Sequence, residues 1–386
     1  MSEFDEIRPY RDEEVEVVLK SLLKEKELFV GLSNFRYPNL TKLFPGLGGK
    51  LAKFYIKKKI NNIDSIAQIQ NVVCKHIEQM LKKSSKQLTE SGLNNLSTDE
   101  SYLFISNHRG IAIDPGLIGY LLLKSNHSTF EVAIGDNLLK KKFIADLLRL
   151  NKSFIVKRSA IGREKLLALK VLSSYIHYTI NTGNNIWIAQ SEGRAKDGND
   201  KTAPSIVKML HMGRSEQDKN LSLKDNLDRL NIVPVSISYE YDPCDKMKAQ
   251  ELYETEHKGG FVKHDKSDQE SIAADLSGFK GNINVTFGSV IDIKESDAVH
   301  IAEKIDNQII NNYMLHPSNY LAYEKMREEN PEIGPSLEAI NSGKKISEDD
   351  RLFFNNRYNE MSTELKPYFL EMYANPVLNY IKLNNE

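Results

Sequence analysis

The sequence predicts an α/β fold with a mixed, mostly parallel central sheet flanked by helices, an N-terminal helical bundle and a C-terminal helical extension. Three observations predict it. Short β-branched runs alternate with helical stretches between residues 101 and 292, whereas the segments before and after them show helical patterns. The composition is that of an ordinary globular protein, 40% hydrophobic and 27% charged. Sheets of this kind bind ligands at the carboxyl ends of their strands.

The N-terminal region, residues 1–95, is expected to be helical. Apolar residues follow helical spacing over Glu14 to Phe29 and again over 63–82. Residues 47–60, LGGKLAKFYIKKKI, place five lysines among apolar side chains. Such a helix either packs with a solvated lysine face or lies on an anionic membrane surface. Serine, asparagine and threonine then accumulate in LTESGLNNLSTDES, which predicts a domain boundary.

The α/β domain is expected over residues 96–296. Its predicted strands are 102–106, 130–134, 153–157, 186–190, 232–238 and 283–291, and its predicted helices are 115–124, 136–150, 160–181 and 203–212. Residues 297–386 return to charged helical patterns and predict a C-terminal helical extension.

Charge and cysteine content exclude several classes of protein. The net charge is −1, so no overall field indicates a nucleic-acid partner. Cys74 and Cys244 make neither a disulfide framework nor a zinc spacing, which is typical of a reducing cytosol. The acidic N-terminus is unlike a signal peptide, and no apolar run approaches the ~20 residues of a spanning helix. We expect a cytoplasmic protein whose membrane contact, if it has one, is peripheral at the inner surface.

The first candidate site motif is NHRGIAIDP, residues 107–115, which follows a predicted strand. The imidazole of His108 is the natural general base near neutral pH. Asp114 could fix its tautomer if the loop folds back, as a carboxylate does in hydrolase triads. Asp114 before Pro115 is also typical of a helix N-cap followed by the first helical position, and the two roles are compatible.

Two further motifs carry positive charge at strand ends. Lys157 and Arg158 follow the run SFIV and could hold a phosphate at a helix N-terminus, or they are a solvated strand end. Glu192-Gly193-Arg194 and Lys196 follow the run WIAQS. Gly193 lets backbone approach a ligand, and an arginine fork suits a phosphate. A solvated loop of mixed charge is the alternative.

The last two features concern shape and metal. Pro234 falls inside the apolar run IVPVSIS. Proline in a strand usually marks an edge or a bulge, and the alternative, which we favour for Pro234 by itself, is that it only shapes the strand locally. The segment DGND, residues 197–200, does not match the ligand spacing of a calcium loop. The sequence therefore suggests no metal site.

In this order, the segments SNHR…DP, FIVKR, SEGRAKDG and VPVSI resemble the four sequence blocks of the glycerol-3-phosphate and lysophosphatidate (1-acylglycerol-3-phosphate) O-acyltransferase family. The resemblance covers roughly residues 100–240, and FGSVID at 287–292 is similar to a late strand of that domain. The helical region before the first block is similar in arrangement to soluble plastid glycerol-3-phosphate acyltransferases.

The resemblance implies transfer of a fatty acyl group from acyl-CoA or acyl carrier protein to a glycerol-phosphate hydroxyl, in phospholipid biosynthesis and without a cofactor. It implies His108 as the base and Asp114 as its partner. It implies phosphate binding by Lys157, Arg158, Arg194 and Lys196, and substrate positioning by Glu192 and Gly193. Backbone N–H groups near 156–158 or Gly193 are candidate donors to the oxyanion.

This chain departs from the family pattern in two places. Five residues separate His108 from Asp114, where the family usually has four, so the loop must absorb one more. Arg194 follows Gly193 directly, which shifts the phosphate fork by one position. The alternative is a non-catalytic lipid- or phosphate-binding protein on the same scaffold. A nucleotide-dependent phosphotransferase is disfavoured because the sequence has no GxxxxGK[ST] loop.

Overall fold

The computed structural model describes residues 3–36, 45–60, 62–139, 141–213, 220–264, 267–294, 297–340 and 346–385. The chain divides into two compact units. Unit 1 comprises Met1–His76 and Phe130–Leu172, and unit 2 comprises Ile77–Thr129 and Ser173–Glu386. No helix among the described residues is long and apolar enough to cross a membrane.

Unit 1 combines N-terminal helices with one parallel strand pair. Its elements are α1 (Asp12–Leu22), α2 (Lys26–Arg36), α4 (Pro45–Ile60), most of α5 (Ile66–Ser84), β3 (Phe130–Gly135), η2 (Asp136–Leu138), α7 (Lys142–Leu150), β4 (Ser153–Val156) and the first half of α8 (Gly162–Asn181). Strands β3 and β4 are parallel. Val15, Val18 and Leu22 of α1 pack with Leu150 of α7 in a small core.

Unit 2 holds the other five strands and the C-terminal helices. Its strands are β1 (Gln87–Ser91), β2 (Leu103–Ser106), β5 (Asn185–Ala189), β6 (Ile232–Tyr239) and β7 (Asn282–Phe287). Its helical elements are η1 (Leu93–Asn95), α6 (Ile113–Lys124), α9 (Pro204–Leu210), α10 (Leu223–Asp228), α11 (Asp245–His257), α12 (Ser267–Ser277), α13 (Ala298–Asn311), α14 (Pro317–Glu329), η3 (Pro331–Ile333), α15 (Leu337–Ile340), α16 (Glu348–Asn359), η4 (Thr363–Leu365) and α17 (Lys366–Asn385).

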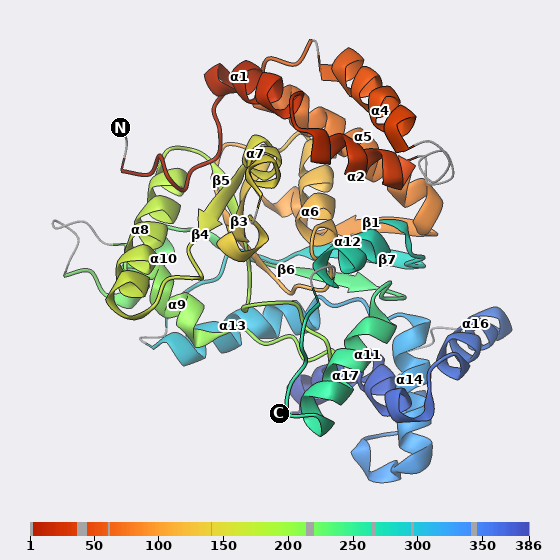
Figure 1. Ribbon diagram of the computed structural model, residues 1–386. Helices are drawn as coiled ribbons and strands as arrows, with labels where there is room; N and C mark the ends of the chain where they lie inside the picture. Colours follow the sequence, from red (N-terminus) through yellow and green to blue (C-terminus); the bar gives the residue numbers. More distant parts are fainter. Residues whose placement is uncertain are drawn as a thin grey trace. The chain divides into compact units, whose positions relative to one another are not determined.

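The strands of unit 2 pair in the order β1-β7-β6-β2-β5. All pairs are parallel except β6 with β7, which is antiparallel. Every residue of β2 and β6 is buried, as near-continuous apolar strands covered on both faces require. In the C-terminal region, α14 and α11 pack beside α17 (Figure 1) and share an aromatic core with α16. The predicted mixed, mostly parallel α/β fold with helical ends is confirmed.

The six predicted strands all form, but three local expectations are wrong. Residues 87–91 form strand β1 in a region expected to be helical. The apolar pattern from Glu14 to Phe29 covers two helices, because α1 ends at Leu22. The N–H groups of Lys24 and Glu25 donate to the carbonyls three residues earlier and close the end of the helix. The last strand ends at Phe287 rather than at 291.

Pro234 lies in the central strand β6, not at an edge. Strand β6 pairs with β2 on one side and with β7 on the other. The β6–β7 ladder begins at Val235, and the carbonyl of Pro234 accepts a hydrogen bond from Gly288, just beyond the end of β7. Pro234 therefore lies one residue before the first β6–β7 pair. The ladder does not need its N–H there, so a proline is tolerated.

Candidate active site

The site begins with a contact between His108, which follows β2, and Asp114 in the first turn of α6. Nδ1 of His108 lies 2.8 Å from Oδ2 of Asp114. Asp114 is buried, whereas the His108 side chain keeps 16% of its surface exposed. The edge of the ring also packs against Trp187 of β5, 5.7 Å between centroids. The five intervening residues therefore do not prevent the two side chains from meeting.

Backbone amides hold Asp114 in this position. Its Oδ2 accepts from the N–H groups of Arg109 (2.6 Å) and Gly110 (3.0 Å), so the loop closes around the carboxylate. The expectation that Asp114 is the N-cap is wrong, because α6 begins at Ile113 and Ala112 occupies that place. Helix α6 thus begins before the predicted start at residue 115, within the stretch that separates His108 from Asp114. A carboxylate in the first turn is also stabilised by the helix dipole.

Tyr239 at the end of β6 completes the environment of Asp114 and was not predicted. Its hydroxyl donates to Oδ1 of Asp114 at 2.6 Å. Burial and the negative charge of Asp114 raise the pKa of Tyr239 well above its usual value. The phenol stays protonated and acts as a donor. The only sequence signal was its position at the carboxyl end of a strand beside β2.

Asp200 joins the loop after β2 to the loop after β5. Its Oδ2 accepts from Nη2 of Arg109 at 2.6 Å and from Nδ2 of Asn107 at 3.1 Å. Asn107 also exchanges two hydrogen bonds with the backbone of Ile237 in β6. Burial disfavours the charge on Arg109, but Asp200 outweighs it and raises the pKa of Arg109. The DGND segment therefore orders the site through an ion pair inside the protein.

The loop after β5 lies directly against the His108 loop. The N–H of Ala195 donates to the carbonyl of His108 at 2.9 Å. Glu192 and Gly193 are exposed, and Gly193 has φ +83°. Nη1 of Arg194 is buried with no hydrogen-bond partner in the described part of the chain. Nζ of Lys196 lies 3.0 Å from the Glu251 carboxylate on α11.

Lys157 and Arg158 belong to unit 1, where they follow β4. Lys157 pairs with Glu6 at 2.8 Å. The N–H of Arg158 donates to Oδ1 of Asp136 at 3.1 Å, and the backbone and hydroxyl of Ser159 donate to the same carboxylate. The Arg158 amide is thus engaged within its own loop. It is not free to serve as the oxyanion donor that the sequence suggested.

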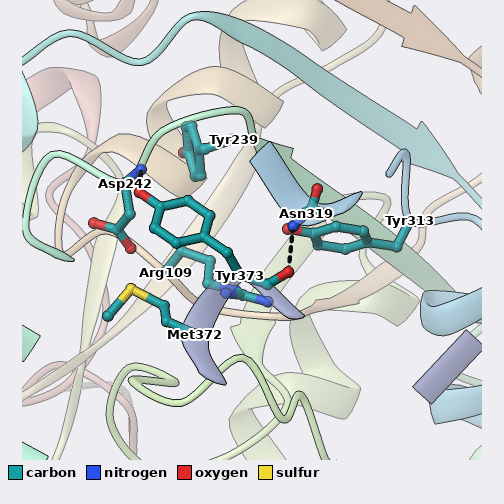
Figure 2. A pocket seen from close by; sticks show the side chains of 7 residues that line it. All are labelled: Arg109, Tyr239, Asp242, Tyr313, Asn319, Met372 and Tyr373. Atoms are coloured by element: carbon teal, nitrogen blue, oxygen red, sulfur yellow. Dashed lines mark hydrogen bonds between the residues drawn. The ribbon is translucent and has the colours of Figure 1, made fainter. Parts of the chain in front are cut away.

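Arg109 is one of the residues that line a small cavity (Figure 2). It is lined by Arg109, Tyr239, Asp242, Tyr313, Asn319, Met372 and Tyr373. Its volume of about 10 Å³ suits about one water molecule, not an acyl chain. Nε of Arg109 is buried and has no hydrogen-bond partner among the residues described. A polar molecule in the cavity that accepts a hydrogen bond from it would therefore be favoured. Within those residues no group of three histidine, cysteine or acidic side chains could hold a metal ion.

Three comparisons with known proteins show what the chain is similar to. Residues 87–238 match the family model described as Acyltransferase, and they include the His108 and Arg194 loops. Comparison with curated proteins finds no match. Among solved structures, the 1-acyl-sn-glycerophosphate (LPA) acyltransferase PlsC from Thermotoga maritima is similar at 13% identity and a TM-score of 0.38, over 74% of this chain and 92% of that one. That likeness is too distant to carry an argument.

Proposed function

We propose that this chain transfers a fatty acyl group from a thioester to the hydroxyl of a glycerol-phosphate-type acceptor, because residues 87–238 match the family model described as Acyltransferase. The donor is acyl-CoA or acyl carrier protein, and the reaction belongs to phospholipid biosynthesis. The observation that carries the proposal is the His108–Asp114 contact of 2.8 Å. It leaves the second ring nitrogen available beside a partly exposed surface.

In this proposal His108 is the general base. The Asp114 carboxylate accepts the Nδ1 hydrogen, so Nε2 carries the lone pair that takes the proton of the acceptor hydroxyl. The hydroxyl oxygen attacks the thioester carbonyl, and the tetrahedral intermediate collapses as the C–S bond breaks. The imidazolium then returns the proton to the departing thiolate. General base catalysis of this kind contributes about 10²–10⁴-fold.

Cations near His108 suit the acceptor phosphate. Arg194 is the strongest candidate, because its buried Nη1 lacks a protein acceptor in the described residues and its loop is bonded to the His108 loop. A buried guanidinium donor gains from a phosphate oxygen. Lys196 would exchange Glu251 for phosphate. Phosphate binding by Lys157 and Arg158, which belong to unit 1, stays a prediction from the sequence. Glu192 and Gly193 would position the substrate.

A peripheral membrane contact is proposed for α4. Lys50, Lys53, Lys57 and Lys58 are exposed on it, and so is Phe54. The side chain of Lys59 lies outside the described residues. A basic helix with an exposed aromatic ring suits an anionic lipid surface at the cytoplasmic face of a membrane. Nζ of Lys53 also lies 5.8 Å from the Phe29 ring, which fits the alternative of an ordinary packed helix.

The competing function is a non-catalytic lipid- or phosphate-binding protein. The additional residue between His108 and Asp114 motivated that alternative. Their contact favours the enzyme, since a binding protein has no need for a buried carboxylate that accepts three hydrogen bonds on Oδ2 alone.

The test is a screen of the purified full chain with acyl-CoA and acyl carrier protein donors. Acceptors are glycerol-3-phosphate, 1-acylglycerol-3-phosphate and monoacylglycerol, with products identified by mass spectrometry. We expect acylated product only with the phosphate-bearing acceptors, and we expect its loss in His108→Ala. His76→Ala is the control because His76 is exposed and outside the site. Full activity in His108→Ala would remove the base, and lipid binding without any transfer would favour the alternative.

A further inference from the structure

We propose that the C-terminal helix α17 is the template that fixes the loop 192–199, and that Asn375 is the positioning residue through which it acts. The contacts between α17 and this loop do not depend on the proposed function. Only the assignment of an acceptor phosphate to this loop rests on the proposed function. Helix α17 lies outside residues 87–238, so the family match says nothing about it.

One stripe of α17 meets the loop. Met372, Asn375, Pro376 and Asn379 follow the i, i+3, i+4, i+7 spacing of a single helix face. Nδ2 of Asn375 donates to the carbonyl of Asp197 at 2.6 Å, and Nδ2 of Asn379 donates to Oδ1 of Asn199 at 3.3 Å. Between these two bonds lies Gly198, in contact with the backbone of Met372 and the ring of Pro376.

The close approach at Gly198 has a chemical reason on both sides. Proline has no N–H, so Pro376 cannot donate to the carbonyl of Met372 four residues earlier, and that carbonyl faces the loop. Gly198 has φ +81°, and a Cβ there would lie far inside van der Waals contact with the same oxygen. Only glycine fits, so the loop backbone is held directly on the helix.

The same helix also meets the opposite side of the site. Met372 and Tyr373 line the cavity that contains Arg109 (Figure 2). The hydroxyl of Tyr373 accepts from the N–H of Asp242 at 2.9 Å. Arg109 is the residue next to His108 and pairs with Asp200 in the far end of the Arg194 loop. One rigid helix therefore sets the loop that carries Arg194 relative to the loop that carries His108.

The effect of losing Asn375 should be selective. Asp197 lies three residues after Arg194, so releasing its carbonyl loosens the end of the loop that carries the phosphate ligands. The His108–Asp114 pair is held by its own backbone amides and by Tyr239, whereas Asn375 bonds to the carbonyl of Asp197. Binding of the acceptor should weaken while the base keeps its geometry.

The experiment compares Asn375→Ala with Asn384→Ala, which removes the same side chain from an exposed position of the same helix. We expect the acceptor KM of Asn375→Ala to rise about tenfold with kcat within about threefold of the parent, since a misplaced ligand costs binding first. Asn375→Gln keeps the amide donor and should recover part of the loss. A fall of about tenfold in the kcat of Asn375→Ala, with its acceptor KM unchanged, would overturn the proposal.

Hydrogen exchange separates this proposal from the proposed function. Amides of residues 195–199 should exchange faster in Asn375→Ala than in the parent, and those of the Asp114 loop should not. This readout needs no substrate. If the parent transfers no acyl group but exchange rises as expected, the enzyme proposal fails and the template stands. If the amides of residues 195–199 exchange at the same rate in Asn375→Ala, in Asn384→Ala and in the parent, the template proposal fails.

Discussion

His108 is held by one carboxylate, and that carboxylate is itself held by three donors. The N–H groups of Arg109 and Gly110 bind Oδ2, and the Tyr239 hydroxyl binds Oδ1. Burying a carboxylate costs free energy unless its oxygens accept hydrogen bonds in this way. The orientation of the imidazole therefore depends on residues from β6 as well as on the local loop.

Replacing Tyr239 with phenylalanine should misorient His108, the proposed base, without removing it. We expect kcat to fall about tenfold and the unfolding free energy to fall by about 1–2 kcal/mol, because a buried acceptor loses its donor. Steady-state kinetics and urea unfolding measure the two effects. Tyr178→Phe is the control, since Tyr178 is half exposed. A Tyr239→Phe enzyme with the parent kcat would show that this hydroxyl does not position Asp114.

The Arg109–Asp200 ion pair should be costly to break from one side. Both side chains are buried, at 6% and 7% exposure. Asp200→Ala leaves a buried guanidinium without its carboxylate, and we expect the unfolding free energy to fall by about 3–5 kcal/mol. Adding Arg109→Met should restore part of the loss. Chemical denaturation of both variants decides this, and a double variant less stable than Asp200→Ala would contradict it.

At the scale of elements, loops at the carboxyl ends of neighbouring strands are joined by short polar links. Asp306 of α13 provides one, since its Oδ1 accepts from the N–H of Thr202 at 2.7 Å. Burial raises the pKa of Asp306 to about 6, above that of an unfolded aspartate. Protonation of Asp306 therefore favours the folded state. This contribution to the unfolding free energy is fully present below the pKa of an unfolded aspartate and is lost as pH rises through about 6.

Asp306→Asn should therefore stabilise the protein at neutral pH. The amide oxygen can still accept from Thr202, but it carries no charge to desolvate. We expect the unfolding free energy to rise by about 1–2 kcal/mol at pH 7.5 and the gain to shrink as pH falls below 6. Urea unfolding at pH 7.5 and 4.5 tests the sign. A gain that is larger at the lower pH would contradict it.

The sequence allowed the elements to be predicted where the chain is locally consistent. Six strands are short apolar runs, and these were found. Strand β1, QLTES, is polar and partly exposed, and it forms because it pairs with β7 almost 200 residues later in the chain. Tyr239 and Asp200 were missed for the same reason, since their partners Asp114 and Arg109 are remote in sequence. The His108 and Arg194 loops were predictable because each follows a recognisable strand.

At the scale of the whole molecule, the C-terminal helices belong to the same compact unit as strands β1, β2, β5, β6 and β7. Phe369 is fully buried in their aromatic core, where its ring lies 4.9 Å from that of Tyr373 between centroids. Tyr373 in turn reaches Asp242 beyond β6. The extension that the sequence left without a role thus supports the site.

Phe369→Ala should destabilise this unit as a whole. We expect a loss of about 3–5 kcal/mol from the cavity it leaves. Trp187 is the single tryptophan and lies in β5, so its fluorescence reports the sheet of unit 2. The fluorescence transition in urea should move to lower concentration. An unchanged Trp187 transition with an earlier loss of helical circular dichroism would mean that the extension unfolds separately.

The central claim is that His108 and Asp114 act as one catalytic unit, and a double-variant cycle tests it most directly. Acyl transfer to the acceptor that gives product in the screen is measured for the parent, His108→Ala, Asp114→Asn and the double variant. We predict that each single variant loses about 10²–10⁴-fold in kcat and that the double variant is no slower than His108→Ala, because residues that act as a unit are non-additive. Losses that multiply in the double variant, or a His108→Ala enzyme with parental kcat, would contradict the account.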